Sequence, residues 1–209
     1  MNSMLSRRGF LRLGTAFGTG LVLSANSPRP LAAAAAAASG APEIFSAGQW
    51  ATIEAMTSCI IPTDHEPGAL EANCVNFIDK ALAREDAALL PTYRAGITAF
   101  IEESQAHFGK PFAQLRVDNR NRLLSALEQG DTLSWPQNLA ATPQLFLHTV
   151  IVHTLIGFLA DPGYGGNRGY AGWQVVGYPG TEHHMGGYSK EQVEGTAPVI
   201  PMWKTDRSG

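Results

Sequence analysis

The sequence predicts an all-α fold: a small bundle of about five helices with a buried central helix and a long irregular C-terminal arm. Apolar residues recur at helical spacing in four segments between residues 46 and 130, and capping or helix-breaking residues bound these segments. A fifth segment, 145–160, is apolar nearly all round, as is typical of a helix that others cover. From residue 161 onward the frequent Gly and Pro residues argue against long helices.

The first two helices have different boundary signals. Ser46 and Gln49 form a capping-box pattern at the start of the first helix, and Pro62 ends it. The second helix is predicted over about 69–84, because apolar residues at helical spacing form one stripe along it.

The next three helices are bounded more sharply. The third follows Pro91 and closes at Gly109, and the fourth begins near residue 118 and stops at Gly130. Thr142 is the predicted N-cap of the fifth helix, with Pro143 at its first position. Because the first four helices are amphipathic and the fifth is not, we expect them to cover it as the central helix.

The N-terminal residues form an export signal. Residues 1–40 hold four Arg and no acidic residue, followed by a mostly apolar stretch and an Ala-rich run, which is the layout of a signal peptide. Its start resembles the twin-arginine export signal, through Arg7, Arg8, Phe10 and Leu11. The apolar stretch, 13–25, is shorter than the roughly 20 residues that span a bilayer, so we expect no transmembrane span in this chain. The sequence thus divides into a signal at 1–40, a helical domain at 41–160 and an irregular arm at 161–209.

The export signal restricts the function. The twin-arginine translocase carries folded proteins, so this chain either holds a cofactor or escorts a partner that does. The sequence has no haem-attachment motif, no cysteine cluster for iron and sulfur, and no glycine-rich dinucleotide or phosphate loop. Because these cofactor motifs are absent, the sequence favours a chain that escorts a cofactor-containing partner. The formal net charge of −3 excludes a broad basic surface, so we do not expect nucleic acid as a partner.

The two cysteines leave two alternatives open. Cys59 and Cys74 lie fifteen positions apart, and in an oxidising compartment they have the even count that a disulfide needs. The alternative is a pair of buried free thiols, because spacing alone does not establish bonding geometry.

Several motifs resemble one known family, the gluconate 2-dehydrogenase subunit 3 family. The resemblance covers roughly Phe45 to Gly180. Its most specific block is D-P-x-Y-G-G-N, which begins at Asp161 and is followed by Arg168. The other matching segments are 60–64, 67–69, 77–79, 172–173 and 177–180.

The resemblance implies a partner-dependent function. In this family a large flavoprotein subunit carries FAD and oxidises a sugar or sugar acid, and a subunit that is a c-type cytochrome carries haem c. The small chain resembles the subunit that bears the export signal, so we expect no cofactor and no active site in this chain. The expected location is the periplasm, on the periplasmic face of the inner membrane through the partner subunits.

The C-terminal arm is the expected contact with the partner. Its glycines permit close approach to another surface, and its aromatic and Arg side chains are typical interface anchors. The alternative is that the segment 161–180 folds back and caps its own bundle. The candidate interface residues are Asp161, Tyr164, Asn167, Arg168, Trp173 and Tyr178.

Two other classes of function remain open: a stand-alone exported metal-dependent hydrolase and a carbohydrate-binding protein. Asp64, His65 and Glu66, with His183 and His184, have the atoms of a metal site. Ligands adjacent in sequence rarely converge on one ion, however, so we expect a solvated turn there and no metal site. The substrate is not identified by the sequence.

Overall fold

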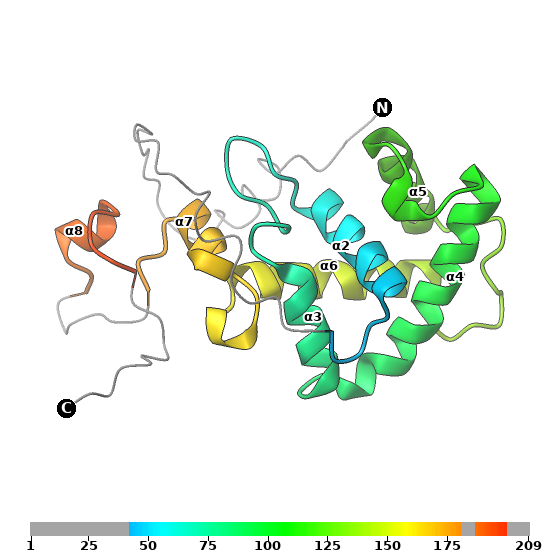
Figure 1. The fold of residues 1–209 in the computed structure, drawn as a ribbon, viewed down its shortest axis with the longest axis horizontal. Helices are drawn as coiled ribbons and strands as arrows, with labels where there is room; N and C mark the ends of the chain where they lie inside the picture. The colour runs from blue at the N-terminus through cyan, green and yellow to red at the C-terminus, as the bar shows by residue number, and fades with distance from the viewer. Residues whose placement is uncertain (1–41, 181–186, 200–209) are drawn as a thin grey trace. The chain divides into compact units, whose positions relative to one another are not determined.

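The structure, a computed structural model, describes residues 42–180 and 187–199 (Figure 1). Within these ranges the chain forms seven α-helices and no β-strand, which confirms the predicted all-α fold. The predicted export signal lies outside the described residues. The helices are α2 (Ala47–Ile60), α3 (Cys74–Ala83), α4 (Leu90–Phe108), α5 (Val117–Gln129), α6 (Pro143–Leu159), α7 (Ala171–Val176) and α8 (Lys190–Val193). Four 3₁₀ helices join them: η2 (Ala87–Leu89), η3 (Phe112–Gln114), η4 (Pro162–Tyr164) and η5 (Arg168–Tyr170).

Local capping sets several of the helix ends, as predicted. The hydroxyl of Ser46 accepts from the backbone N–H of Gln49 at 3.4 Å, and the Gln49 side chain accepts from the Ser46 N–H at 2.9 Å. Helices α4 and α5 end at Gly109 and Gly130, whose φ angles of 62° and 78° suit glycine. At the start of α6 the hydroxyl of Thr142 accepts from the backbone of the third residue of the helix.

Helix α3 begins later than the sequence predicts. Residues 69–73 form turns, and Asn73 precedes the helix in a left-handed conformation with φ 57° and no side-chain cap. The helix therefore begins at Cys74, five positions after the predicted start at residue 69. The turns are held by contacts from a distant part of the chain, which helical periodicity does not report.

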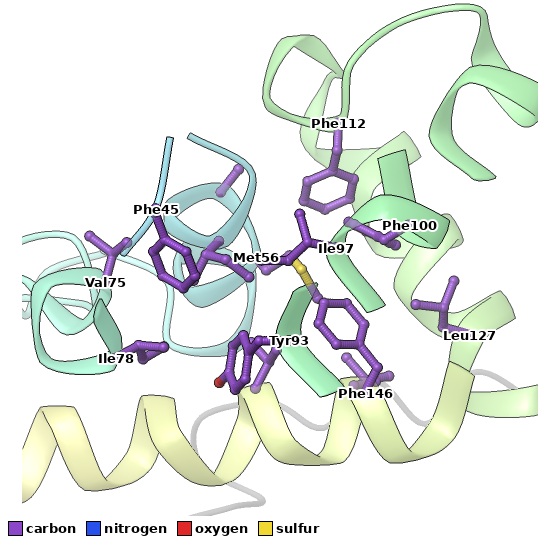
Figure 2. Packing of buried hydrophobic residues seen from close by; sticks show 14 of the residues in the cluster. Phe45, Met56, Val75, Ile78, Tyr93, Ile97, Phe100, Phe112, Leu127 and Phe146 are labelled. Atoms are coloured by element: carbon purple, nitrogen blue, oxygen red, sulfur yellow. The ribbon is translucent and has the colours of Figure 1, made fainter. Parts of the chain in front are cut away.

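Helix α6 is the centre of the bundle, as predicted. It contacts α2, α3, α4, α5 and α7 (Figure 1). Its Phe146 is fully buried, and Figure 2 shows it beside Met56 of α2 and Ile97 of α4. Helices α2 to α6 contribute side chains to one apolar core. Burial of such large side chains is the main source of stability.

Two buried carboxylates bind the backbone of two segments that lie outside the helices, residues 43–45 and 133–134. Asp79 of α3 accepts from the backbone N–H groups of residues 43, 44 and 45 at 2.6, 3.0 and 2.8 Å. Glu103 of α4 is fully buried and accepts from the backbone of Leu133 and Ser134, from the Ser134 hydroxyl and from the His107 ring. Burial opposes ionisation of Glu103, but these bonds together lower its pKa. Each carboxylate therefore attaches a loop to the bundle through charge-assisted bonds.

The packing of α4 on α6 depends on the small size of one residue. A Cβ atom at Gly96 would lie 2.2 Å from the Phe146 ring. We expect Gly96→Ala to lower the free energy of unfolding by about 1–3 kcal/mol, because the core has no room to accommodate it. Gly48→Ala is the matched control, since its added Cβ would meet nothing within 4 Å. Equal denaturation midpoints for the two variants would contradict this packing.

Candidate functional site

The two motif-bearing segments meet in space. We call the segments 61–72 and 161–173, with the hydrogen bonds that join them, the loop junction. The first segment connects α2 to α3 and the second follows α6. A small apolar cluster lies with them, and its buried members are Ile61, Ala69, Ala72, Cys74, Phe158 and Ala171.

Arg168 joins the two segments directly. Its backbone N–H donates to the carbonyl of Ala72 at 3.0 Å, and its Nε donates to the carbonyl of Glu71 at 3.2 Å. The side chain of Glu71 in turn accepts from the hydroxyl of Thr63 at 2.6 Å and the backbone of Gly68 at 2.8 Å. Burial opposes ionisation of Glu71, but these bonds and the Arg168 charge lower its pKa. Arg168 therefore acts within the chain, as one half of the junction.

Asn167 holds the second segment on the end of α6. It is fully buried, and its amide nitrogen donates to the carbonyl of Ala160 at 2.9 Å. Its amide oxygen accepts from the backbone N–H of Gly172 at 2.8 Å, and its own N–H donates to the carbonyl of Gly157 at 2.7 Å. A Cβ at Gly166 would lie 2.1 Å from that Gly157 carbonyl, so only glycine permits this approach. The G-G-N motif thus lets the backbone of residues 165–167 pack against the C-terminal end of α6.

The arm contains a helix that the sequence does not predict. Helix α7 covers Ala171–Val176, in a segment where the frequent Gly and Pro residues argue against long helices. Its Trp173 is buried, and the indole N–H donates to the carbonyl of Leu159 at 2.6 Å. Tertiary packing against α6 thus stabilises a helix too short to form alone. The arm also contains the short helix α8, with a capping box at Ser189.

The six candidate interface residues differ in exposure. Asp161, Asn167 and Trp173 are buried within this chain, so their side chains position the loop. Arg168 and Tyr178 are half-buried, and the Tyr178 ring stacks edge-on against Trp173 at 4.9 Å. Tyr164 is 44% exposed. The fold-back alternative therefore describes most of this segment, and contact with a partner stays a prediction that rests chiefly on Tyr164.

One face of α6 is mostly apolar and uncovered by the described residues, with the exposed His148 between Leu145 and Val152. Leu145, Val152, Ile156 and Leu159 are 46%, 36%, 44% and 42% exposed. Their spacing places them in one stripe about 21 Å long, at 1.5 Å rise per residue. We call these four residues the α6 stripe. The central helix is therefore buried on the side that faces the bundle and open along this stripe. No helix among residues 42–180 and 187–199 is long and apolar enough to cross a membrane.

The two histidines of α6 lie on different faces, as their spacing predicts. His148 is exposed, and His153 is buried with Nδ1 2.9 Å from the hydroxyl of Tyr93. Nε2 of His153 lies 3.4 Å from the carboxylate of Asp86. Burial lowers the pKa of His153, although Asp86 opposes the shift. Tyr93 is fully buried, so its contact with His153 links α4 to α6 within the core.

The turn that follows α2 brings three metal-ligating residue types together. Ligand atoms of Asp64, His65 and Glu66 lie within 4.8 Å of one another. The Asp64 carboxylate accepts from the backbone N–H of Glu66 at 2.9 Å and lies 3.3 Å from the His65 ring. These are the bonds of an exposed turn, and His183 and His184 lie outside the described residues.

Cys59 and Cys74 are free thiols in the structure, and no disulfide joins them. Cys59 packs at the larger core, while Cys74 is fully buried in the smaller cluster. Burial raises the pKa of Cys74 to about 12 and also raises that of Cys59, against the nearby Arg120. Thiol exchange requires a thiolate, so neither side chain is a reactive nucleophile at neutral pH.

The sequence analysis missed three residues of this region, namely Glu71, Asn76 and Lys80. Asn76 is buried, and its amide donates to the carbonyl of Gly165 at 2.7 Å. Because neighbours in sequence lie about 100° apart on a helix, a polar residue between Val75 and Phe77 is ordinary amphipathic patterning, and the sequence carries no signal for this contact.

This small all-α domain has two loops joined by hydrogen bonds and an exposed apolar stripe. Such a surface is suited to a subunit of an assembly. Comparison with protein families gives a specific result: the profile described as gluconate 2-dehydrogenase subunit 3 matches residues 47–180. The chain therefore belongs to the gluconate 2-dehydrogenase subunit 3 family, as its motifs suggested. Family membership implies that it is a subunit of a multi-subunit dehydrogenase complex. No curated protein and no solved structure gives a significant match.

The role of Asn167 is testable by truncation. We expect Asn167→Ala to lower the free energy of unfolding by about 2–4 kcal/mol, because it removes two buried hydrogen bonds and leaves backbone groups unpaired. The exposed Asn138→Ala is the matched control, with an expected change below about 0.5 kcal/mol. Chemical denaturation followed by circular dichroism measures both. A wild-type midpoint for Asn167→Ala would show that the loop does not depend on this amide.

Proposed function

We propose that this chain is the non-catalytic small subunit of a periplasmic, membrane-associated, FAD-dependent dehydrogenase complex of the gluconate 2-dehydrogenase type. In this proposal it binds the folded flavoprotein in the cytoplasm, stabilises it, and supplies the twin-arginine signal that carries both across the membrane. Electrons then pass from FAD to the haem of a c-type cytochrome subunit. This chain holds neither cofactor.

The α6 stripe is the observation that carries the proposal. Four large apolar side chains line the uncovered face of the central helix, and an exposed apolar patch typically marks an interaction site. A stripe fixed along a rigid helix pairs with a partner at little cost in conformational entropy. The family relationship identifies the class of partner, a subunit of a dehydrogenase.

The bundle supports such a role in a second way. The loop junction and the buried carboxylates fix the chain's own loops through hydrogen bonds within the chain. A preorganised surface of this kind favours tight association. It is also consistent with an export route that accepts folded proteins.

A charge in the stripe is expected to abolish assembly without unfolding the chain. Ile156→Asp places a carboxylate at a position that is 44% exposed, so the melting temperature should stay within a few degrees of wild type. Burial of that charge in an interface is costly, so co-purification of the flavoprotein should fall at least about tenfold. Val117→Asp, at a position 61% exposed on α5, is the control and should bind normally. Full binding by Ile156→Asp would remove the stripe from the interface.

The export role is tested at the signal itself. Replacing Arg7 and Arg8 together with Lys keeps the charge but removes the paired guanidinium groups. We expect the flavoprotein to remain in the cytoplasm, as measured by flavin and dehydrogenase activity in separated cell fractions. Active flavoprotein in the periplasm of cells with this variant would refute the escort role, while leaving complex formation possible.

A further inference from the structure

A second surface feature lies beside the loop junction. A pocket of about 360 Å³ is lined by residues of α3, by the two residues 84 and 85 that come soon after α3, and by the turn after α6. Phe77 and Ala81 form its apolar lining, and Lys80, Arg84 and Glu85 contribute charges. Tyr164, the most exposed of the candidate interface residues, lies at its edge together with Gly163. The docking of the Asp161–Asn167 turn on α3 therefore creates a pocket that neither segment forms alone.

Two polar groups in this pocket have no partner among the described residues. The ammonium group of Lys80 and the hydroxyl of Tyr164 make no hydrogen bond or ion pair with any residue in 42–180 or 187–199. Lys80 is half-buried, because the adjacent loop packs along its side chain near Gly165. A lysine whose stem is covered in this way presents its ammonium group beside the pocket, where an anion can bind it.

The other two charged side chains of the pocket are less suited to bind an anion, because one is paired and the other is negative. Arg84 pairs with Glu43 at 2.8 Å, so its guanidinium is held toward the segment before α2. Glu85 supplies a negative charge at the same pocket. One carboxylate therefore suits the pocket better than a multiply charged anion, since it binds Lys80 without strong repulsion from Glu85.

We propose that this pocket receives an Asp or Glu side chain from the flavoprotein subunit, with the carboxylate bound by the Lys80 ammonium and the Tyr164 hydroxyl. The methylene groups of that side chain lie against Phe77 and Ala81. This inference rests on the proposed function, since it names the chemistry of a contact between the two subunits. It also gives the exposed Tyr164 of the family motif a specific role.

The pocket is large enough to admit a protruding side chain. Pockets that enclose drug-sized ligands or cofactors run from roughly 300 to 1,000 Å³. At about 360 Å³ this one is near the lower limit, and its lining offers a single free cation among the described residues. A protruding acidic side chain with its neighbouring backbone fills such a volume. The contact adds charge complementarity to the apolar contact proposed at the α6 stripe.

Carbodiimide coupling tests the contact directly, because it joins a lysine amine to a carboxylate that touches it. The full chain is co-expressed with its flavoprotein, the purified complex is treated with carbodiimide, and the linked peptides are identified by mass spectrometry. We expect an isopeptide bond between Lys80 and an Asp or Glu of the flavoprotein. Lys80→Gln should abolish this product while leaving couplings at other lysines in place.

Binding measurements with matched variants provide the second readout. Lys80→Glu should weaken the complex at least about tenfold, since it replaces an attraction with a repulsion. Lys110→Glu makes the same charge change at an exposed lysine just after the end of α4, outside the pocket lining, and should change binding less than about twofold. Tyr164→Phe should weaken the complex by a smaller factor, through loss of the hydroxyl alone. Thermal denaturation of each free variant confirms that it is folded.

The outcomes separate this inference from the proposed function. If the complex forms but Lys80 gives no coupling and Lys80→Glu binds like Lys110→Glu, the pocket contact is wrong and the subunit role stands. If wild-type chain binds no flavoprotein at all, both fall together. If coupling occurs at Lys80 and the charge reversal weakens binding, the contact is established.

Discussion

The close packing of other helices around α6 is the constraint on which the rest of the structure depends. Five helices contact α6, and its Phe146 fits against α4 only because Gly96 has no side chain. The buried bond between His153 and Tyr93 adds a polar link between the same two helices. With one side of α6 enclosed in this way, its remaining apolar side chains are held in a straight, rigid row. The proposed binding surface is therefore a consequence of the core.

The main features of the fold were predictable because they depend on short-range signals. The capping box at Ser46, the proline after Thr142 and the glycines at 109 and 130 act within a few residues, and the structure has helix ends at each of them. The start of α3 was not predictable in this way. Asn73 takes a left-handed conformation in turns that Arg168 holds from 95 positions away in the chain. Helix α7 was missed for the same reason, since burial of Trp173 against α6 stabilises it.

The candidate site was predictable only as a set of motifs. Their residues suggested both an interface and a fold-back cap, and composition alone does not distinguish the two. The structure separates them by burial: Asn167 and Trp173 hold the chain's own loop, while Tyr164 is left exposed beside Lys80. The α6 stripe was hidden from the sequence, because a helix that is apolar all round gives no indication of which face its neighbours leave open.

The central claim is that this chain functions as a subunit bound to a flavoprotein, and purification of the tagged chain from its native membranes tests it most directly. Flavin absorbance and haem staining of the purified material identify what accompanies it. We expect a coloured complex in which a flavoprotein and a c-type cytochrome co-purify with the chain in fixed ratio. A chain that is recovered folded, alone and colourless would contradict the account.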